Sequence, residues 1–232
     1  MQEIHVSPNN VQEVARHART ALSQARFSVA VTGAGISRAS GLPLLRERVE
    51  GVPLNEFFRA ELWRTRPEVY YRLYRRLLSE WRHARPNGAH YALARRGVWV
   101  ITQNIDGLHR DAGTQHLIEL HGNLRELRCT SCGHVYGADL VWRFSVPRCP
   151  GCHHILHPGV SLEGEEIRHY SLAVDWVGRC EVLYVVGTSL QMDPVRRLPD
   201  LARRRGALVV WVNDEAERLL PRLLTGAALS DA

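Results

Sequence analysis

The stretch from Val98 to His109 holds the densest set of residues able to do chemistry. It opens with an apolar run, Val98 to Ile101, which predicts a buried strand. The polar residues that follow are Thr102, Gln103, Asn104 and Asp106. Open α/β sheets bind ligands at the carboxyl ends of their strands, so these side chains predict a ligand site.

A second apolar run, His116 to Leu120, leads directly to His121 and Gly122. An imidazole can accept a proton near neutral pH, which makes His121 a candidate general base. Taken alone, the same histidine is better explained as a core residue with satisfied hydrogen bonds.

A glycine turn follows the predicted strand Phe27 to Val31. Gly33 and Gly35 would let the backbone approach a pyrophosphate, and a following helix would offer free N–H groups. Arg38 stands where the dinucleotide-binding fingerprint has its third glycine, so the glycines alone also suit a plain turn.

Four of the five cysteines form two C-x-x-C pairs, Cys129 with Cys132 and Cys149 with Cys152. This spacing predicts a tetrahedral Zn²⁺ site of four thiolates, with no open position for catalysis. A redox dithiol and simple buried cysteines are the alternatives. Cys180 stands alone and is expected to be a small buried residue.

These motifs resemble those of the sirtuin family, the NAD-dependent protein-lysine deacylases. The resemblance rests on Thr102 to His109, on Leu120 to Gly122, and on the loop Gly33 to Pro43. The family continues that loop with Asp-Phe-Arg-Gly, whereas this chain has Leu44, Leu45, Arg46 and Glu47. Arg46 is therefore retained and the aromatic residue is absent.

The resemblance implies that NAD is consumed as a co-substrate and that the zinc is structural. It implies that His121 is the general base toward a ribose hydroxyl, and that Asn104 and Asp106 hold the ribose and the nicotinamide amide. The positions that match NAD contacts are Gly33, Ala34, Gly35, Ser37, Arg46, Gln103, Asn104, Ile105, Asp106, Gly187, Thr188, Ser189, Asn213 and Ala228.

The segment His157 to Glu165 matches the family's substrate-binding strand, which pairs with an extended acyl-lysine peptide through its backbone. The implied substrate-binding residues are Val160, Ser161, Leu162, Glu163 and Gly164. Glu163 replaces a phenylalanine of the family. The branch that removes acidic acyl groups has a Tyr-x-x-Arg pair, whereas Tyr71 and Arg75 are four residues apart and are better explained by an exposed, arginine-rich helix.

Strands alternating with helices predict an α/β fold, a parallel sheet with helices on both faces. The family fold is a Rossmann-type domain with a small zinc ribbon. We expect residues 1–125 and 159–232 to form the NAD-binding domain, with a helical insert at about 46–85, and residues 126–158 to form the zinc module.

The formal net charge is +6, and every Lys or Arg residue counted in it is an arginine, because the chain contains no lysine. The protein therefore cannot be its own acyl-lysine substrate. The dispersed charge indicates a solvated surface rather than a nucleic-acid site. The sequence holds no bilayer-spanning apolar run and no signal peptide, so we expect a cytoplasmic protein; its oligomeric state is not indicated.

The predicted function is an NAD-dependent protein-lysine deacylase. The alternatives are a mono-ADP-ribosyltransferase that uses the same NAD site and a non-catalytic NAD-sensing or DNA-associated module.

Overall fold

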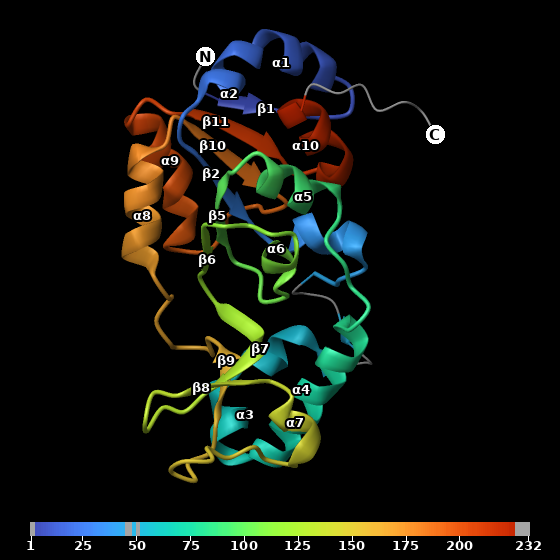
Figure 1. The fold of residues 1–232 in the computed structure, drawn as a ribbon, viewed down its shortest axis with the longest axis vertical. Coiled ribbons are helices and arrows are strands. Elements are labelled where there is room, and N and C mark those ends of the chain that lie inside the picture. The colour runs from blue at the N-terminus through green and yellow to red at the C-terminus, as the bar shows by residue number, and fades with distance from the viewer. Residues whose placement is uncertain (1–2, 45–47, 50–51, 226–232) are drawn as a thin grey trace.

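The computed structural model describes residues 3–44, 48–49 and 52–225, which form two lobes along the long axis of the molecule (Figure 1). Both ends of the chain contribute to the larger lobe. The smaller lobe comes from the middle of the chain, mainly from residues 54–81 and 122–160.

The larger lobe is built on a six-stranded sheet in which every neighbouring pair of described strands is parallel. The strand order is β1 (Glu3–His5), β11 (Leu208–Val212), β10 (Val182–Val186), β2 (Ser28–Thr32), β5 (Trp99–Thr102) and β6 (Leu117–Glu119). After β2 the chain proceeds to β5 and β6 on one side, and later returns to β10 and β11 on the other. The strand order therefore reverses between β2 and β10, where open α/β sheets bind ligands.

Helices cover both faces of this sheet, as predicted. One core lies under α1 (Val11–His17), α2 (Arg19–Gln24), α5 (Gly88–Arg95) and α10 (Ala216–Thr225). The other core lies under α8 (Tyr170–Arg179) and α9 (Leu198–Arg204). Strand residues alternate between the two, because successive side chains of a strand point to opposite faces: Ala30 joins the first core, and Val29 and Val31 join the second. Among the described helices, none is both long and apolar enough to cross a bilayer.

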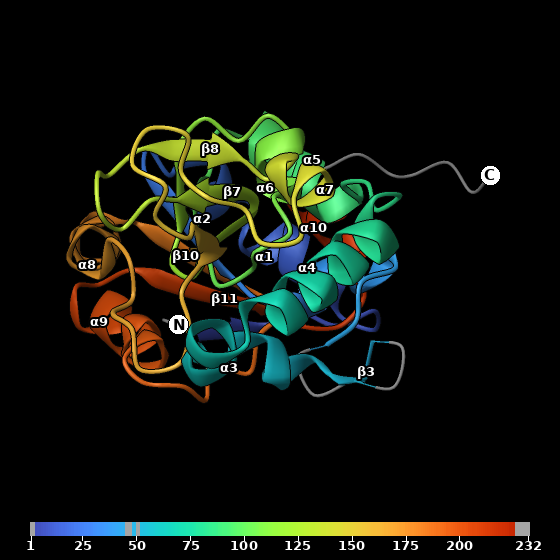
Figure 2. The same ribbon diagram turned by 90° about the horizontal axis from the view of Figure 1, so that it is seen from below.

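The smaller lobe combines a three-stranded antiparallel sheet with a helical layer. Strand β7 (Gly122–Arg128) pairs with β8 (Val135–Gly137) and β9 (His157–Val160). The helices are α3 (Ala60–Thr65), α4 (Pro67–Trp81) and α7 (Leu140–Arg143), and α4 lies between the other two (Figure 2). Pro67 occupies the first turn of α4, where its missing N–H costs no hydrogen bond, so a new helix can begin there after α3. A short hairpin joins β3 (Arg48–Val49) to β4 (Val52–Pro53), and a 3₁₀ helix, Leu54–Phe58, follows it.

The sequence from Asn10 to Ala25 has the periodicity of one helix that starts at an Asn cap. The structure confirms the extent of this prediction but not a single continuous helix. The chain forms α1 and α2, which meet at Ala18. Asn10 does not cap α1 through its side chain; its Oδ1 instead accepts a hydrogen bond from the N–H of Ser7, 2.8 Å away. Strand β1 was not predicted, because three residues are too short to show a periodicity.

Candidate active site

The glycine turn after β2 packs directly against the end of β10, at the point where the strand order reverses. The N–H of Gly35 donates to the carbonyl oxygen of Gly187 at 2.8 Å, and the N–H of Gly33 donates to Val186 at 3.2 Å. A Cβ on Gly35 would lie 2.7 Å from the Gly187 oxygen, so a side chain there would collide with backbone. Gly187 also has a φ of 60°, a conformation that favours glycine.

The chain after this turn forms a 3₁₀ helix, Ala34–Ser40, rather than an α-helix. Part of the expected supply of free N–H groups is used internally, because Gly33, Gly35 and Ile36 all donate to backbone carbonyls. The close approach of two backbones explains these glycines as directly as a phosphate contact does.

Asn104, Asp106 and Ser37 form a hydrogen-bonded cluster beside the turn. The Ser37 hydroxyl donates to Oδ2 of Asp106 at 2.7 Å, and Nδ2 of Asn104 lies 3.0 Å from Ser37 Oγ and 3.2 Å from Asp106 Oδ2. The other carboxylate oxygen, Oδ1, accepts the N–H of Leu108 at 2.8 Å. Burial raises the pKa of Asp106, while these donors and Arg125 act in the opposite direction.

Gln103, Thr188 and Asn213 connect the ends of β5, β10 and β11, across the end of β2. Nε2 of Gln103 donates to Thr188 Oγ1 at 3.1 Å, and the N–H of Thr188 donates to Oδ1 of Asn213 at 3.0 Å. The structure thus brings together predicted residues from β5, β10 and β11 at one edge of the sheet. Ser189 is exposed at the same edge, whereas Ile105 is buried in the core of the smaller lobe.

His121 lies at the junction of the two lobes, between β6 and β7. Its side chain is half-buried, and desolvation lowers its pKa, which favours the neutral imidazole that a general base requires. Its carbonyl oxygen accepts the N–H of Ser161 at 2.8 Å. The candidate base is therefore bonded through its backbone to the predicted substrate segment.

The predicted substrate segment begins in β9 and continues beyond it. Val160 and Leu162 are buried, Ser161 is half-buried, and Glu163 is exposed. Gly164 follows in an exposed turn. The exposed position of Glu163 means that its carboxylate does not line a buried channel in this conformation.

A clamp of side chains holds this segment in place. Glu165 accepts the N–H of Leu162 at 2.8 Å and contacts Nε2 of His157 at 2.9 Å. Nδ1 of His157 lies 2.7 Å from the carbonyl oxygen of Pro158. Each ring nitrogen of His157 thus lies beside an oxygen atom, so the buried imidazole links β9 to the turn that carries Glu165.

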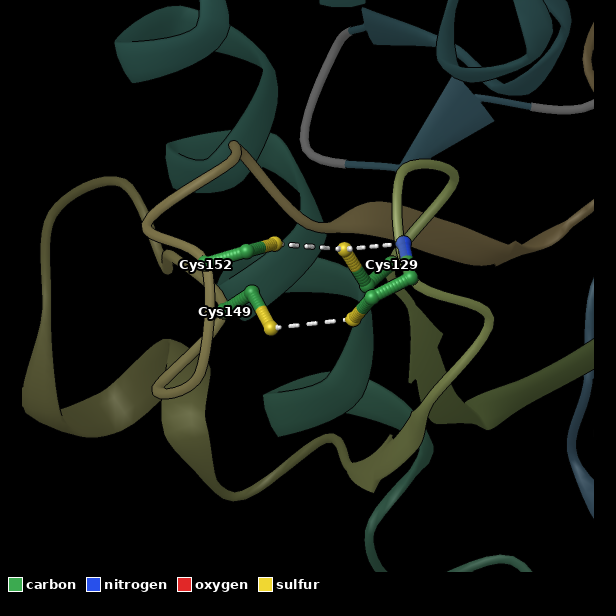
Figure 3. Close-up of side chains that lie close together, drawn as sticks. Cys129, Cys149 and Cys152 are labelled. Carbon is green, nitrogen blue, oxygen red and sulfur yellow. Dashed lines mark hydrogen bonds between the residues drawn. The ribbon is translucent and has the colours of Figure 1, made fainter.

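The four paired cysteines converge in the smaller lobe (Figure 3). Their sulfur atoms all lie within 4.8 Å of one another, with Cys129 and Cys152 at 3.4 Å and Cys132 and Cys149 at 3.6 Å. Four thiolates around Zn²⁺, each about 2.3 Å from the ion, would be about 3.8 Å apart. The donor set and its spacing therefore fit a tetrahedral zinc ion.

Two further groups contact these sulfur atoms. The Tyr136 hydroxyl donates to Cys149 Sγ at 3.2 Å and holds the pKa of that thiol below its usual range, and Nδ1 of His134 lies 3.3 Å from Cys132 Sγ. His134 is thus a neighbour of the cluster and not a member of the four-sulfur set.

Two predicted residues, Arg46 and Ala228, lie outside the described residues. The buried polar residues Thr32 and His90 were not predicted, and His109 was part of a motif without an assigned role. His109 is fully enclosed, with Nε2 3.0 Å from Thr32 Oγ1 and its ring 4.8 Å from that of His90. The sequence contains one indication of a role for His90: it is three residues after Asn87, which is the spacing of a reciprocal helix cap.

The fold and this edge of the sheet define a nucleotide-binding α/β protein with a cysteine-bound metal module. A model of the Sir2 family matches residues 33–194. An NAD-dependent protein deacylase of Thermococcus sibiricus is 35% identical over 217 residues, which cover 86% of this chain and 85% of the relative.

Solved structures with a similar fold belong to the same family. A Sir2 complex with a p53 peptide and NAD⁺ is 29% identical, with a TM-score of 0.80, covering 93% of this chain and 99% of that one. Sir2Tm bound to a propionylated peptide has the same identity and coverage and a TM-score of 0.78. The chain belongs to the Sir2 family.

Proposed function

We propose that this protein is an NAD-dependent protein-lysine deacylase, which transfers an acyl group from lysine to ADP-ribose and releases nicotinamide. Two observations support this proposal. Asn104 and Asp106, hydrogen-bonded to Ser37, follow the carboxyl end of β5, and His121 follows the carboxyl end of the neighbouring parallel strand β6. His121 is also hydrogen-bonded through its backbone to Ser161 of the substrate segment. Relatives with the same arrangement of the chain are named as deacylases, and neighbouring structures hold acyl peptides and NAD⁺.

In this proposal NAD supplies a ribose carbon that becomes electrophilic as nicotinamide leaves. Asn104 and Asp106 orient the ribose and the carboxamide, and Gln103 contacts the ribose. The acyl oxygen of the substrate bonds to the ribose carbon that nicotinamide leaves. Neutral His121 then accepts the proton of a ribose hydroxyl, and that oxygen attacks the carbon of the acyl group. The lysine amine leaves, and one water completes the formation of O-acyl-ADP-ribose. Segment 160–164 pairs with the backbone of the substrate peptide, so an exposed Glu163 does not prevent binding.

The four cysteines would hold one Zn²⁺, which would stabilise the smaller lobe without taking part in the reaction. The cysteine module shares one core with α4, since Leu127 and Leu156 pack in the same cluster as Tyr70, Tyr71 and Tyr74. The domain boundaries at 125/126 and 158/159 and the cytoplasmic location stay predictions.

The test is incubation of the zinc-loaded protein with NAD and an acetyl-lysine peptide, followed by mass spectrometry. A deacylase yields free lysine, nicotinamide and O-acetyl-ADP-ribose. A mass increase of the protein or peptide by ADP-ribose would favour the transferase alternative, and unchanged NAD would favour the non-catalytic one. Because the chain contains no lysine, any lysine product comes from the added peptide.

A further inference from the structure

His90 lies outside the machinery described so far, yet it is fully buried and contacts the centre of that machinery. It occupies the first turn of α5, which begins after Asn87. Oδ1 of Asn87 accepts the N–H of Ala89 at 3.0 Å, and the N–H of Asn87 donates in return to Nδ1 of His90 at 3.3 Å. A reciprocal cap of this kind usually employs Glu or Gln at the position that His90 holds.

This cap fixes the position of the proton on the imidazole. Nδ1 accepts a hydrogen bond and so carries no hydrogen. Burial lowers the pKa of His90 to about 4, so the ring is neutral near pH 7. A neutral imidazole has one N–H, which must be on Nε2.

Nε2 of His90 faces the Ser37 hydroxyl, whose oxygen is 3.5 Å away. Ser37 has a single proton, and the neighbouring Asp106 carboxylate can only accept, so that proton points to Asp106. The two lone pairs of Ser37 Oγ then accept from Nδ2 of Asn104 and from Nε2 of His90. Each hydrogen atom of these donor groups then has one acceptor.

The chain also determines which way the Asn104 amide faces. Its Nδ2 hydrogens point to Ser37 and Asp106, so its Oδ1 faces away from both. Asn87 ties down the same 3₁₀ helix from the other side, since its Nδ2 donates to the Ile36 carbonyl at 2.8 Å and to Ser40 Oγ at 3.0 Å.

We propose that His90 is a positioning residue, which acts through the Ser37 hydroxyl to fix the orientation of Asn104 and Asp106 toward the nicotinamide ribose. The inference rests on the proposed function, because it concerns the same site. It differs from a purely structural role for His90 in α5, since it requires the ring to be a hydrogen-bond donor as well as an acceptor.

The test compares His90→Gln with His90→Leu. Glutamine can accept the Asn87 N–H and donate to Ser37, whereas leucine keeps the bulk of the side chain and does neither. His90→Leu should lower kcat for nicotinamide release about 10–100-fold, as for a catalytic group displaced by a fraction of an ångström to one ångström. His90→Gln should regain most of that loss. Calorimetry with ADP-ribose, which lacks nicotinamide, should show nearly unchanged affinity in both variants.

A double-mutant cycle with Ser37→Ala tests the path of the effect. If His90 acts through Ser37, the His90→Leu change should cost little further activity in the Ser37→Ala background. Independent losses that add would overturn the proposal. So would a His90→Gln enzyme as slow as His90→Leu, or a kcat loss matched by a fall in Tm or in ADP-ribose affinity.

Nitrogen-15 NMR of the histidine rings gives a readout that does not need turnover. The expected spectrum of His90 has a protonated Nε2 and an unprotonated Nδ1, and the reverse tautomer would refute the hydrogen-bond chain. A wild-type protein that releases no nicotinamide would overturn the proposed function instead, while the tautomer would still decide whether the chain exists.

Discussion

Two tyrosines one turn apart on α4 should respond with opposite sign to the loss of the same atom. Tyr70 and Tyr74 are both fully buried in the core of the smaller lobe, and both pack against Phe57, with ring centroids 5.1 Å and 5.5 Å away. The Tyr74 hydroxyl donates to the carbonyl oxygen of Leu124 at 2.5 Å. The Tyr70 hydroxyl has no hydrogen-bond partner within the described part of the chain.

Replacing either residue with phenylalanine keeps the ring and removes only the oxygen. Tyr74→Phe should lower the free energy of unfolding by about 1–1.5 kcal/mol, which is the net contribution of a buried hydrogen bond to stability. Tyr70→Phe should raise it by about 1–2 kcal/mol, because an unpaired buried hydroxyl loses its hydration without compensation. For a protein of this size, 1 kcal/mol corresponds to about 2–4 °C in Tm.

The assay is calorimetry and urea unfolding of the zinc-loaded protein at pH 7. Tyr71→Phe is the matched control, since the Tyr71 hydroxyl donates to the Leu156 carbonyl and its loss should also destabilise. A Tyr70→Phe protein that is destabilised as much as Tyr74→Phe would refute the reasoning.

Four further predictions concern the site and the metal. Desolvation lowers the pKa of His121, so kcat/KM should fall on the acid side only below pH 6.5. The variant His121→Ala should lose roughly 10²–10⁴-fold in rate but should still bind NAD in calorimetry. Burial lowers the pKa of His90 from 6.5 to about 4, so the neutral ring's contribution to stability is lost as pH falls between these values. Over this range the free energy of unfolding, measured in urea, should fall by up to roughly 3 kcal/mol more for the wild type than for His90→Gln. Cys149→Ser should release zinc to a chelator and lower Tm. Gly35→Ala should weaken NAD binding in calorimetry, because its Cβ would collide with Gly187.

The sequence predicted the elements whose signal is local. The apolar runs Val182 to Val186 and Leu208 to Val212 predict two buried strands, and β10 and β11 have these bounds. The position of Gln103 to Asp106 at a ligand-binding edge followed from the same rule, since the carboxyl end of a buried strand must leave the core there. The cysteine cluster was equally predictable from spacing.

Contacts between distant segments could not be predicted in this way. Arg75 follows Tyr71 by one turn, yet its Nη1 donates to the carbonyl oxygens of Val141, Phe144 and Ser145. The Tyr71 hydroxyl meanwhile donates to Leu156. The two side chains therefore serve different parts of the smaller lobe. Tyr71 is buried and Arg75 is half-buried, so the expected exposed helix is wrong at these two positions.

The buried polar residues beneath the site explain why its catalytic side chains can be rigid without a large electrostatic cost. The Thr32 hydroxyl donates to Thr102 Oγ1 at 2.8 Å, so it must accept from Nε2 of His109, and Thr102 Oγ1 in turn accepts the backbone N–H of Asn104 at 3.0 Å. Burial lowers the pKa of His109, as it does that of His90, so both rings are neutral near pH 7. Neutral donors thus hold the backbone and the side chain of Asn104 from two directions. A positive histidine in the same place would attract the Asp106 carboxylate and compete for its oxygens, whereas a neutral one leaves that charge available to the ligand.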